Sequence, residues 1–138
     1  MAHTVSDYMT PHPTVVEVTD TLRAVAETMA TQDVGSLIVA EDGAVVRLIT
    51  DRDLVVRGLA KGIGLDAPVG QLATGDLVTV QPGDSVVDVV EIMRDRAVRR
   101  VPVVEGDRAV GIVTIGDLAV ALDSDSALAD ISAAPPND

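Results

Sequence analysis

The sequence predicts an α/β (α+β) protein made of two copies of one β-α-β-β-α unit. Three observations support this fold class. Apolar residues make up 47% of the 138 residues and are almost all aliphatic, strand-like runs alternate with helix-like stripes, and the pattern recurs after sixty-four residues. Because the small sheet of one unit cannot bury its apolar face alone, we expect the two sheets to pack against each other about a pseudo-two-fold axis.

The repeat keeps its register without a gap. Residues 50–53 read Thr-Asp-Arg-Asp and residues 114–117 read Thr-Ile-Gly-Asp, and each group joins a strand-like run to a helix-like run. Two matched halves therefore predict two matched polar junctions and two candidate clefts. The same offset also pairs Val16 with Val80, Asp20 with Asp84, Val25 with Val89, Met29 with Met93, and Glu41 with Glu105.

Short apolar runs rich in Val, Ile and Leu predict three strands in each unit. Asp42-Gly43 in the first unit and Gly106-Asp107 in the second are expected at the hairpin turns between the last two strands. The predicted strands cover residues 15–18, 36–40 and 45–49 in the first unit, and 78–80, 101–104 and 109–113 in the second.

Each unit also predicts two helices. The first helix has apolar residues at i, i+3, i+4 and i+7, and Asp20 or Asp84 is its expected N-cap. The second begins at the polar junction, at Thr50 or Thr114, and in the first unit it is expected to stop near Gly62 because glycine is favoured just past a helix end. The last helix is expected to end near Leu122.

The repeat divides the chain into four parts. Residues 1–62 are assigned to the first unit with an N-terminal arm, residues 63–68 to a linker and residues 69–122 to the second unit. Residues 123–138 are rich in Asp, Ser, Ala and Pro, and we expect them to form a flexible acidic tail.

Charge and composition exclude several classes of function. The net charge of −12 argues against general nucleic-acid binding and against binding to an anionic membrane surface. The apolar runs are shorter than a membrane span needs, and the N-terminus lacks the features of a secretory signal. We therefore expect a cytoplasmic protein without a membrane segment.

Neither catalysis nor metal binding is predicted. The chain has no Cys, and it contains no Gly-rich phosphate loop and no nucleophile–His–acid arrangement. His3 and His12 lie isolated in the N-terminal arm, without partners at the spacing of metal ligands. The sequence thus predicts a protein that is not an enzyme and requires no cofactor.

The motifs resemble those of the cystathionine β-synthase (CBS) domain, and two in tandem resemble a Bateman module. Those motifs lie at residues 101–104, 110–114 and 117–118 in the second unit, at 35–39 and 48–54 in the first, and at 7–11 in the arm. The resemblance covers about residues 5–122. The run from Thr50 to Lys61 is similar to stand-alone CBS-pair proteins of actinobacteria, some of them tied to stress or hypoxic responses.

The resemblance implies clefts between the repeats that bind adenosine-containing ligands such as AMP, ADP, ATP or S-adenosylmethionine. In such a cleft the Asp holds the ribose, the Thr and the helix N-terminus face phosphate, and backbone of the other repeat reads the adenine. Two residues depart from the pattern: Arg47 replaces the glycine seen as Gly111, and Ile38 replaces the proline seen as Pro102. Carried over, one cleft would use Thr114 and Asp117 with Thr14, Val34 and Gly35, and the other Thr50 and Asp53 with Val78, Val98 and Arg99.

Each of these residues also has a purely structural interpretation. Thr-x-x-Asp after a strand is a capping box in its own right, and an Asp folded back on the backbone is less free to hold a ribose. Arg99 and Arg100 are the best candidates for binding phosphate, but they are equally readable as surface residues paired with acids. Arg52 and Arg47 are likewise either phosphate contacts or solvated side chains. The sequence leaves these alternatives open.

The functional hypothesis is a sensor in which an adenine nucleotide acts as a regulatory ligand. Ligand binding would bias a dimer or partner interface. A homodimer is expected because the second helix of each repeat carries apolar residues on an outer face. The alternative is a ligand-free dimeric adaptor or secreted signalling protein that acts through an unidentified protein partner, and a nucleic-acid-linked regulator is a more remote third hypothesis.

Overall fold

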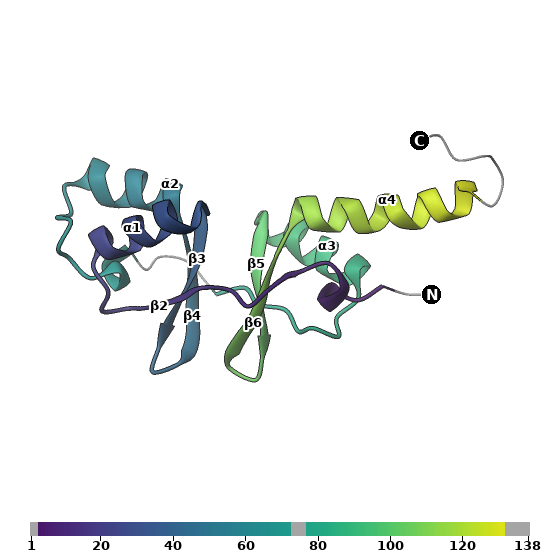
Figure 1. Cartoon of the computed structure of the whole chain (residues 1–138), viewed down its shortest axis with the longest axis horizontal. Coiled ribbons are helices and arrows are strands. Elements are labelled where there is room, and N and C mark those ends of the chain that lie inside the picture. The colour runs from purple at the N-terminus through teal and green to yellow at the C-terminus, as the bar shows by residue number, and fades with distance from the viewer. Residues whose placement is uncertain (1–2, 73–76, 132–138) are drawn as a thin grey trace.

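The computed structural model describes residues 3–72 and 77–131, with side chains described up to residue 123. Two three-stranded sheets stand at the centre, and the helices lie on their outer sides (Figure 1). Strand β4 contacts both β5 and β6, so the two sheets meet face to face. The predicted α/β class is confirmed. One sheet has the order β2 (Val15–Glu17), β3 (Ser36–Glu41), β4 (Ala44–Thr50), and the other β1 (Thr10–Pro11), β6 (Arg108–Thr114), β5 (Arg100–Glu105).

The N-caps of the first helices lie one residue later than predicted. Thr21 caps α1 (Leu22–Gln32) by accepting a hydrogen bond from the backbone N–H of Ala24 at 3.1 Å. Asp20 instead accepts from the backbone N–H of Glu17 at 2.9 Å and closes the turn that leads into the helix. The predicted cap at Asp20 is therefore wrong.

In the second repeat, too, the helix is capped by the residue that follows the predicted cap. Ser85 caps α3 (Val86–Arg96) by accepting from the backbone N–H of Asp88 at 3.1 Å. Asp84 accepts from the backbone N–H of Gln81 at 2.8 Å, so the cap predicted at Asp84 is wrong for the same reason. In both repeats a hydroxyl caps the helix and the preceding carboxylate holds the turn.

The helix predicted after Thr50 is not one regular helix. It begins as α2 (Asp51–Asp53), widens into the π-helical turn η2 (Leu54–Gly58), and tightens into the 3₁₀ turn η3 (Leu59–Lys61). Gly62 follows in the left-handed region at φ 73°, as a glycine stop requires. The predicted start and end are confirmed, while the change of pitch is not visible in the sequence pattern.

Two predictions for the second repeat need correction. Residues 78–80 do not form a strand: Val80 makes a single parallel bridge to Val103. The last helix, α4 (Ile115–Ile131), continues well past Leu122, so residues 123–131 are helical rather than a flexible tail. The sequence after Leu122 contains Ala and Leu, which favour helix, and no proline occurs between the start of α4 and Pro135. The remainder of the predicted tail, residues 132–138, lies outside the described residues.

The two repeats exchange short segments with each other. The 3₁₀ turn η1 (Val5–Asp7) precedes the first repeat, yet Val5 is fully buried in the core of the second. The 3₁₀ turn η4 (Val69–Leu72) precedes the second repeat, yet Val69 is fully buried in the core of the first. Packing therefore crosses the linker that the sequence predicted at residues 63–68.

The N-terminal arm is fixed on the second sheet by β1. Thr10 pairs with Ile112, and Pro11 with Gly111. A Cβ atom built on Gly111 would lie 2.5 Å from Sδ of Met9 and 2.9 Å from the carbonyl oxygen of Thr10, so only glycine lets the arm approach this closely. The glycine of the repeat motif thus serves the packing of the arm.

Candidate functional site

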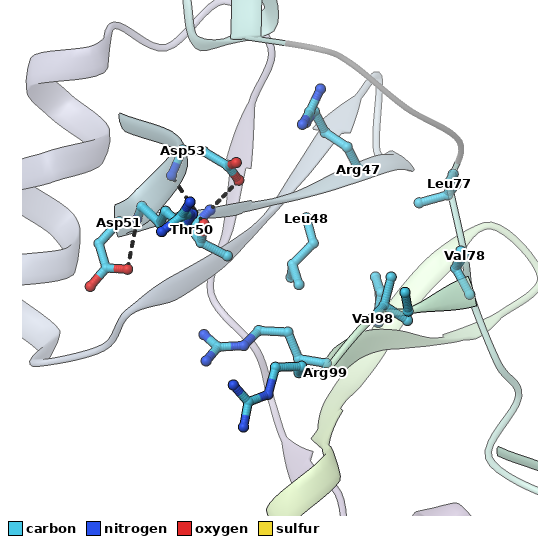
Figure 2. Close-up of a pocket in the computed structure, with 13 residues that line it drawn as sticks. Arg47, Leu48, Thr50, Asp51, Asp53, Leu77, Val78, Val98 and Arg99 are labelled. Carbon is cyan, nitrogen blue, oxygen red and sulfur yellow. Dashed lines mark hydrogen bonds between the residues drawn. The ribbon is translucent and has the colours of Figure 1, made fainter. Parts of the chain in front are cut away.

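A cavity of about 540 Å³ opens where the end of β4 faces the start of β5 (Figure 2). Both repeats line it. The first repeat supplies Arg47, Leu48 and the turn at residues 50–53, and the second supplies Leu77, Val78, residues 97–100 and Pro102. Leu48 lies in the middle, between the polar turn and the side chains of Val78 and Val98, and Arg47 and Arg99 lie on either side of it, so charged groups surround an aliphatic middle (Figure 2). All five residues predicted for this cleft come together here with Arg100, the other candidate for phosphate binding: Thr50, Asp53, Val78, Val98 and Arg99.

The Thr50–Asp53 turn forms a complete capping box. Thr50 Oγ1 accepts from the backbone N–H of Asp53 at 3.1 Å, and Asp53 Oδ2 accepts from the backbone N–H of Thr50 at 2.9 Å. Oδ1 of Asp53 lies 3.7 Å from Nε of Arg57. The capping interpretation is therefore confirmed, and it occupies only one of the two carboxylate oxygens.

The turn is also held to the neighbouring strand. The backbone N–H of Asp51 donates to the carbonyl oxygen of Gly35 at 3.0 Å, and Asp51 Oδ1 accepts from the backbone N–H of Arg52 at 2.8 Å. Fixing the turn in this way leaves the N-terminus of a short helical segment facing the cavity. Such N-termini present backbone N–H groups to anions.

Arg47 lines the cavity with a guanidinium whose pKa is shifted by burial. It is half-buried at the cavity wall (Figure 2), and its Nε atom is buried without a hydrogen-bond partner. Burial lowers the pKa of the Arg47 guanidinium, the carboxylate of Asp53 opposes this, and the neighbouring charge of Arg57 adds to the lowering. The group nevertheless stays charged, because an arginine side chain does not deprotonate in proteins. Burying a guanidinium whose Nε atom has no hydrogen-bond partner costs free energy, so this site favours an anionic ligand.

Three further arginines line the same cavity. Arg52 and Arg99 are exposed and Arg100 is half-buried. Within the described residues, none of the three forms an ion pair with an acidic side chain. The interpretation of Arg99 and Arg100 as a pair neutralised by surface acids therefore lacks support.

The other predicted cleft has a different character. Thr114 and Asp117 form the same capping box, with hydrogen bonds of 3.1 and 2.9 Å. The Thr14 hydroxyl donates to the side chain of Gln32, Val34 is exposed, and Gly35 lies against the Asp51 carboxylate. None of the five residues predicted for this cleft lines either of the two cavities described here.

A second cavity of about 350 Å³ adjoins the first. It lies between α3 and the start of α4, has Met93 and Ile115 in its lining, and shares Ala97, Val98 and Arg99 with the first cavity. Sequence reasoning missed this cavity, and it also missed five lining residues of the first: Leu48, Asp51, Leu77, Ala97 and Pro102. Their positions in the sequence could have indicated them, because each of the five lies within two residues of a predicted or weighed site residue.

Neither a metal site nor a membrane span is found in the part of the chain that the structure describes. Residues 3–72 and 77–131 contain no group of three or more His, Cys, Asp or Glu side chains that could hold a metal ion. No helix within the same ranges is both long and apolar enough to cross a bilayer.

With this geometry established, comparison with known proteins identifies the family. Residues 5–58 and 69–124 each match the CBS domain. The chain belongs to the CBS-domain family. The CBS domain-containing protein YhcV of Bacillus subtilis is 35% identical over 116 residues, which cover 84% of this chain and 83% of that protein. Hypoxic response protein 1 of Mycobacterium tuberculosis is 38% identical over 118 residues, which cover 84% of this chain and 82% of that protein.

Solved structures agree with the CBS-pair fold. A crystal structure of Hypoxic Response Protein I with two coordinated zinc ions superposes with a TM-score of 0.78 at 36% identity, over 86% of this chain and 98% of that one. A crystal structure of CBSX2 in complex with AMP superposes with a TM-score of 0.75 at 27% identity, over 90% of this chain and 98% of that one. Proteins built on such pairs are typically regulatory.

Proposed function

We propose that this CBS pair is a regulatory sensor that binds an adenosine-containing ligand in the cavity between Thr50–Asp53 and Val98–Arg100. The observation that carries the proposal is the cavity itself. It joins a helix N-terminus and four arginines from two repeats to an aliphatic middle of suitable size for a small ligand. The AMP found in CBSX2 supports an adenosyl ligand in this family.

Each part of the cavity has a role that suits such a ligand. Leu48 and Val98 would hold the adenine between aliphatic side chains, since the chain has no Phe or Trp to stack on it. Oδ1 of Asp53 would exchange its contact with Arg57 for the ribose hydroxyls, while Oδ2 keeps the cap. The arginines would hold phosphate by charge-assisted hydrogen bonds.

Ligand binding would act by linkage. A ligand that contacts both repeats stabilises the closed arrangement of the two sheets and thereby shifts any equilibrium coupled to it. The protein itself would perform no chemistry, require no catalytic cofactor and work in the cytoplasm.

Isothermal titration calorimetry with AMP, ADP, ATP and S-adenosylmethionine tests the proposal. Wild-type protein should bind at least one of them, and Asp53→Asn should weaken binding about tenfold while leaving the unfolding temperature within a few degrees, because the amide oxygen can still cap the helix. Asp117→Asn is the matched control and should leave binding unchanged. Absence of binding at millimolar ligand would reject the proposal.

The second candidate is a ligand-free dimeric adaptor, and exposed apolar side chains favour it. Val55, Leu59 and Val120 on the second helical segments are 54%, 60% and 58% exposed, and such side chains on an outer face suit a dimer or partner interface. Sedimentation of wild-type protein, Leu59→Glu and Val120→Glu tests this interface. A dimer that both substitutions dissociate and that nucleotides do not affect would favour the adaptor.

A further inference from the structure

The two clefts are related by the pseudo-symmetry of the chain, but their arginines are not shared equally between them. Four arginines line the cavity described above. The positions sixty-four residues away in the other repeat are equivalent in the fold, because Arg47 pairs with Val39 as Gly111 pairs with Val103. The four equivalences are Arg47 with Gly111, Arg52 with Gly116, Arg99 with Gly35, and Arg100 with Ser36.

The two clefts therefore carry opposite charge. In the first, four guanidinium groups face the carboxylates of Asp51 and Asp53, which leaves a net charge of +2. In the second cleft, the equivalent positions hold no arginine. Ile115 is equivalent to Asp51, Asp117 to Asp53, and Asp33 to Ala97. The net charge of these positions is therefore −2. A chain with a net charge of −12 has thus gathered four of its ten Lys and Arg residues in one cavity.

The packing of the N-terminal arm makes this asymmetry part of the fold. At Gly111, the space that an arginine side chain would need is filled by Met9 and by the backbone of Thr10. At Arg47, the side chain lines the cavity, and its Nε atom has no partner. The N-terminal arm therefore fills the space beside Gly111, whereas the other cleft presents the Arg47 guanidinium with its Nε atom lacking a hydrogen-bond partner.

From these contacts we infer that the Arg47 cleft selects a polyphosphate, an adenosine di- or triphosphate over AMP or S-adenosylmethionine, and that the Thr114–Asp117 cleft takes no phosphorylated ligand. The inference rests on the proposed adenosyl site and names its ligand class. Each added phosphate group gives the ligand at least about one more negative charge. A site with four guanidinium groups gains from each addition, whereas the sulfonium cation of S-adenosylmethionine is repelled.

Arg47 is the residue that distinguishes polyphosphates. Arg99 and Arg100 lie at the start of β5, and Arg52 lies in the first turn after Thr50, so these three arginines line the cavity from both repeats. Arg47 approaches from β4, on the other side of Asp53 (Figure 2). Because the attraction between the Arg47 guanidinium and a ligand grows with the negative charge of the ligand, Arg47 should contribute more to the binding of ATP than to that of AMP.

Calorimetry in metal-free buffer with ATP, ADP, AMP, S-adenosylmethionine and inorganic tripolyphosphate tests the inference. For wild-type protein we expect one ATP per chain, affinity that falls from ATP to ADP to AMP, and competition by tripolyphosphate. Arg47→Gln should weaken ATP about tenfold, as expected for loss of one charge-assisted contact, and AMP less than about threefold. Arg108→Gln, at an exposed strand end outside the cavity, is the matched charge control and should change neither affinity.

The outcomes separate this inference from the proposed function. If AMP or S-adenosylmethionine binds at least as tightly as ATP, the adenosyl site stands and its polyphosphate selectivity is refuted. If two ATP molecules bind per chain, the claim that the Thr114–Asp117 cleft takes no phosphorylated ligand is refuted. Equal losses for ATP and AMP in Arg47→Gln refute the role of Arg47. If none of the five compounds binds, the adenosyl site itself is rejected.

Discussion

Replacing Gly111 by Ala tests how the N-terminal arm is held on the second repeat. The added Cβ would lie 2.5 Å from Sδ and 2.9 Å from Cγ of Met9, and 2.9 Å from the carbonyl oxygen of Thr10. Non-bonded heavy atoms prefer separations of about 3.5–4.0 Å, so these atoms must move by about 1 Å. The side chain of Met9 can rotate away, but the Thr10 carbonyl belongs to the backbone of β1 and can move only with the arm.

The expected cost follows from this overpacking. Insertion of one methyl group into a tightly packed site costs about 1–3 kcal/mol. For a domain of this size, about 2 kcal/mol corresponds to a fall in the unfolding temperature of roughly 5–10 °C. Thermal unfolding followed by circular dichroism measures it. Gly64→Ala is the matched control, since a Cβ there meets no atom within 4 Å, and it should leave the unfolding temperature unchanged or slightly raised.

A double-mutant cycle with Met9→Ala identifies the contact that carries the cost. If Met9 accounts for much of the clash, Gly111→Ala should cost less in the Met9→Ala background than in the wild-type background, by about 0.5–2 kcal/mol. The remainder would come from the Thr10 carbonyl. Strictly additive effects in the cycle would refute a contribution from Met9, and equal unfolding temperatures for Gly111→Ala and Gly64→Ala would refute this account of the arm.

Three further substitutions test the core, the cap and a second tight glycine. Leu118→Ala should lower the free energy of unfolding by about 2–5 kcal/mol in urea titrations, because this side chain is fully buried in the second core; a loss below 1 kcal/mol would contradict that burial. Thr114→Ala should cost about 1 kcal/mol through the lost cap yet leave ATP affinity unchanged, and weakened ATP binding would show that its cleft is in use. Gly58→Ala should destabilise less than Gly111→Ala, because its Cβ meets only the mobile end of Leu22 at 2.9 Å; an equal fall in unfolding temperature would argue against this reasoning.

The repeated architecture was predictable because it depends on the spacing of apolar and polar residues, which can be read directly from the sequence. The offset that matches Thr50 with Thr114 fixes the order of strands and helices in both halves, and five of the six predicted strands are present. The exception is residues 78–80, where Val80 makes one bridge only. The two valines of this short segment do not suffice for strand pairing, although Val80 is 2% exposed and packs in the core of the second repeat.

Helix ends were less predictable because several polar residues compete for each cap. Asp20 and Thr21 are adjacent and both are good N-caps, and the structure uses one for the turn and the other for the helix. The extension of α4 past Leu122 was missed because Asp and Ser are common in loops. Weak local preferences of this kind are decided by tertiary context.

The residues of the candidate site were predictable from the sequence, but the difference in shape between the two clefts was not. The residues of the Thr50–Asp53 cleft meet as the resemblance implied. The sequence also showed that Arg47 replaces a glycine, yet whether Arg47 would enter the cleft or lie on the surface depended on the packing of β4 against the second repeat. The occupation of the Gly111 side by Met9 depended on the arm, which the sequence had assigned to the first unit.

The exchange of η1 and η4 makes the two halves inseparable as folding units. A fragment cut between Gly62 and Val69 would leave the first half without Val69 and Leu72, and the second half without Val5, and all three residues are 0–1% exposed in the intact chain. Neither fragment has a complete interior, so the whole chain should unfold in one cooperative transition. A chain that carried one repeat alone would have to exchange its leading segment with a second copy, and the tandem arrangement turns that intermolecular requirement into an intramolecular one.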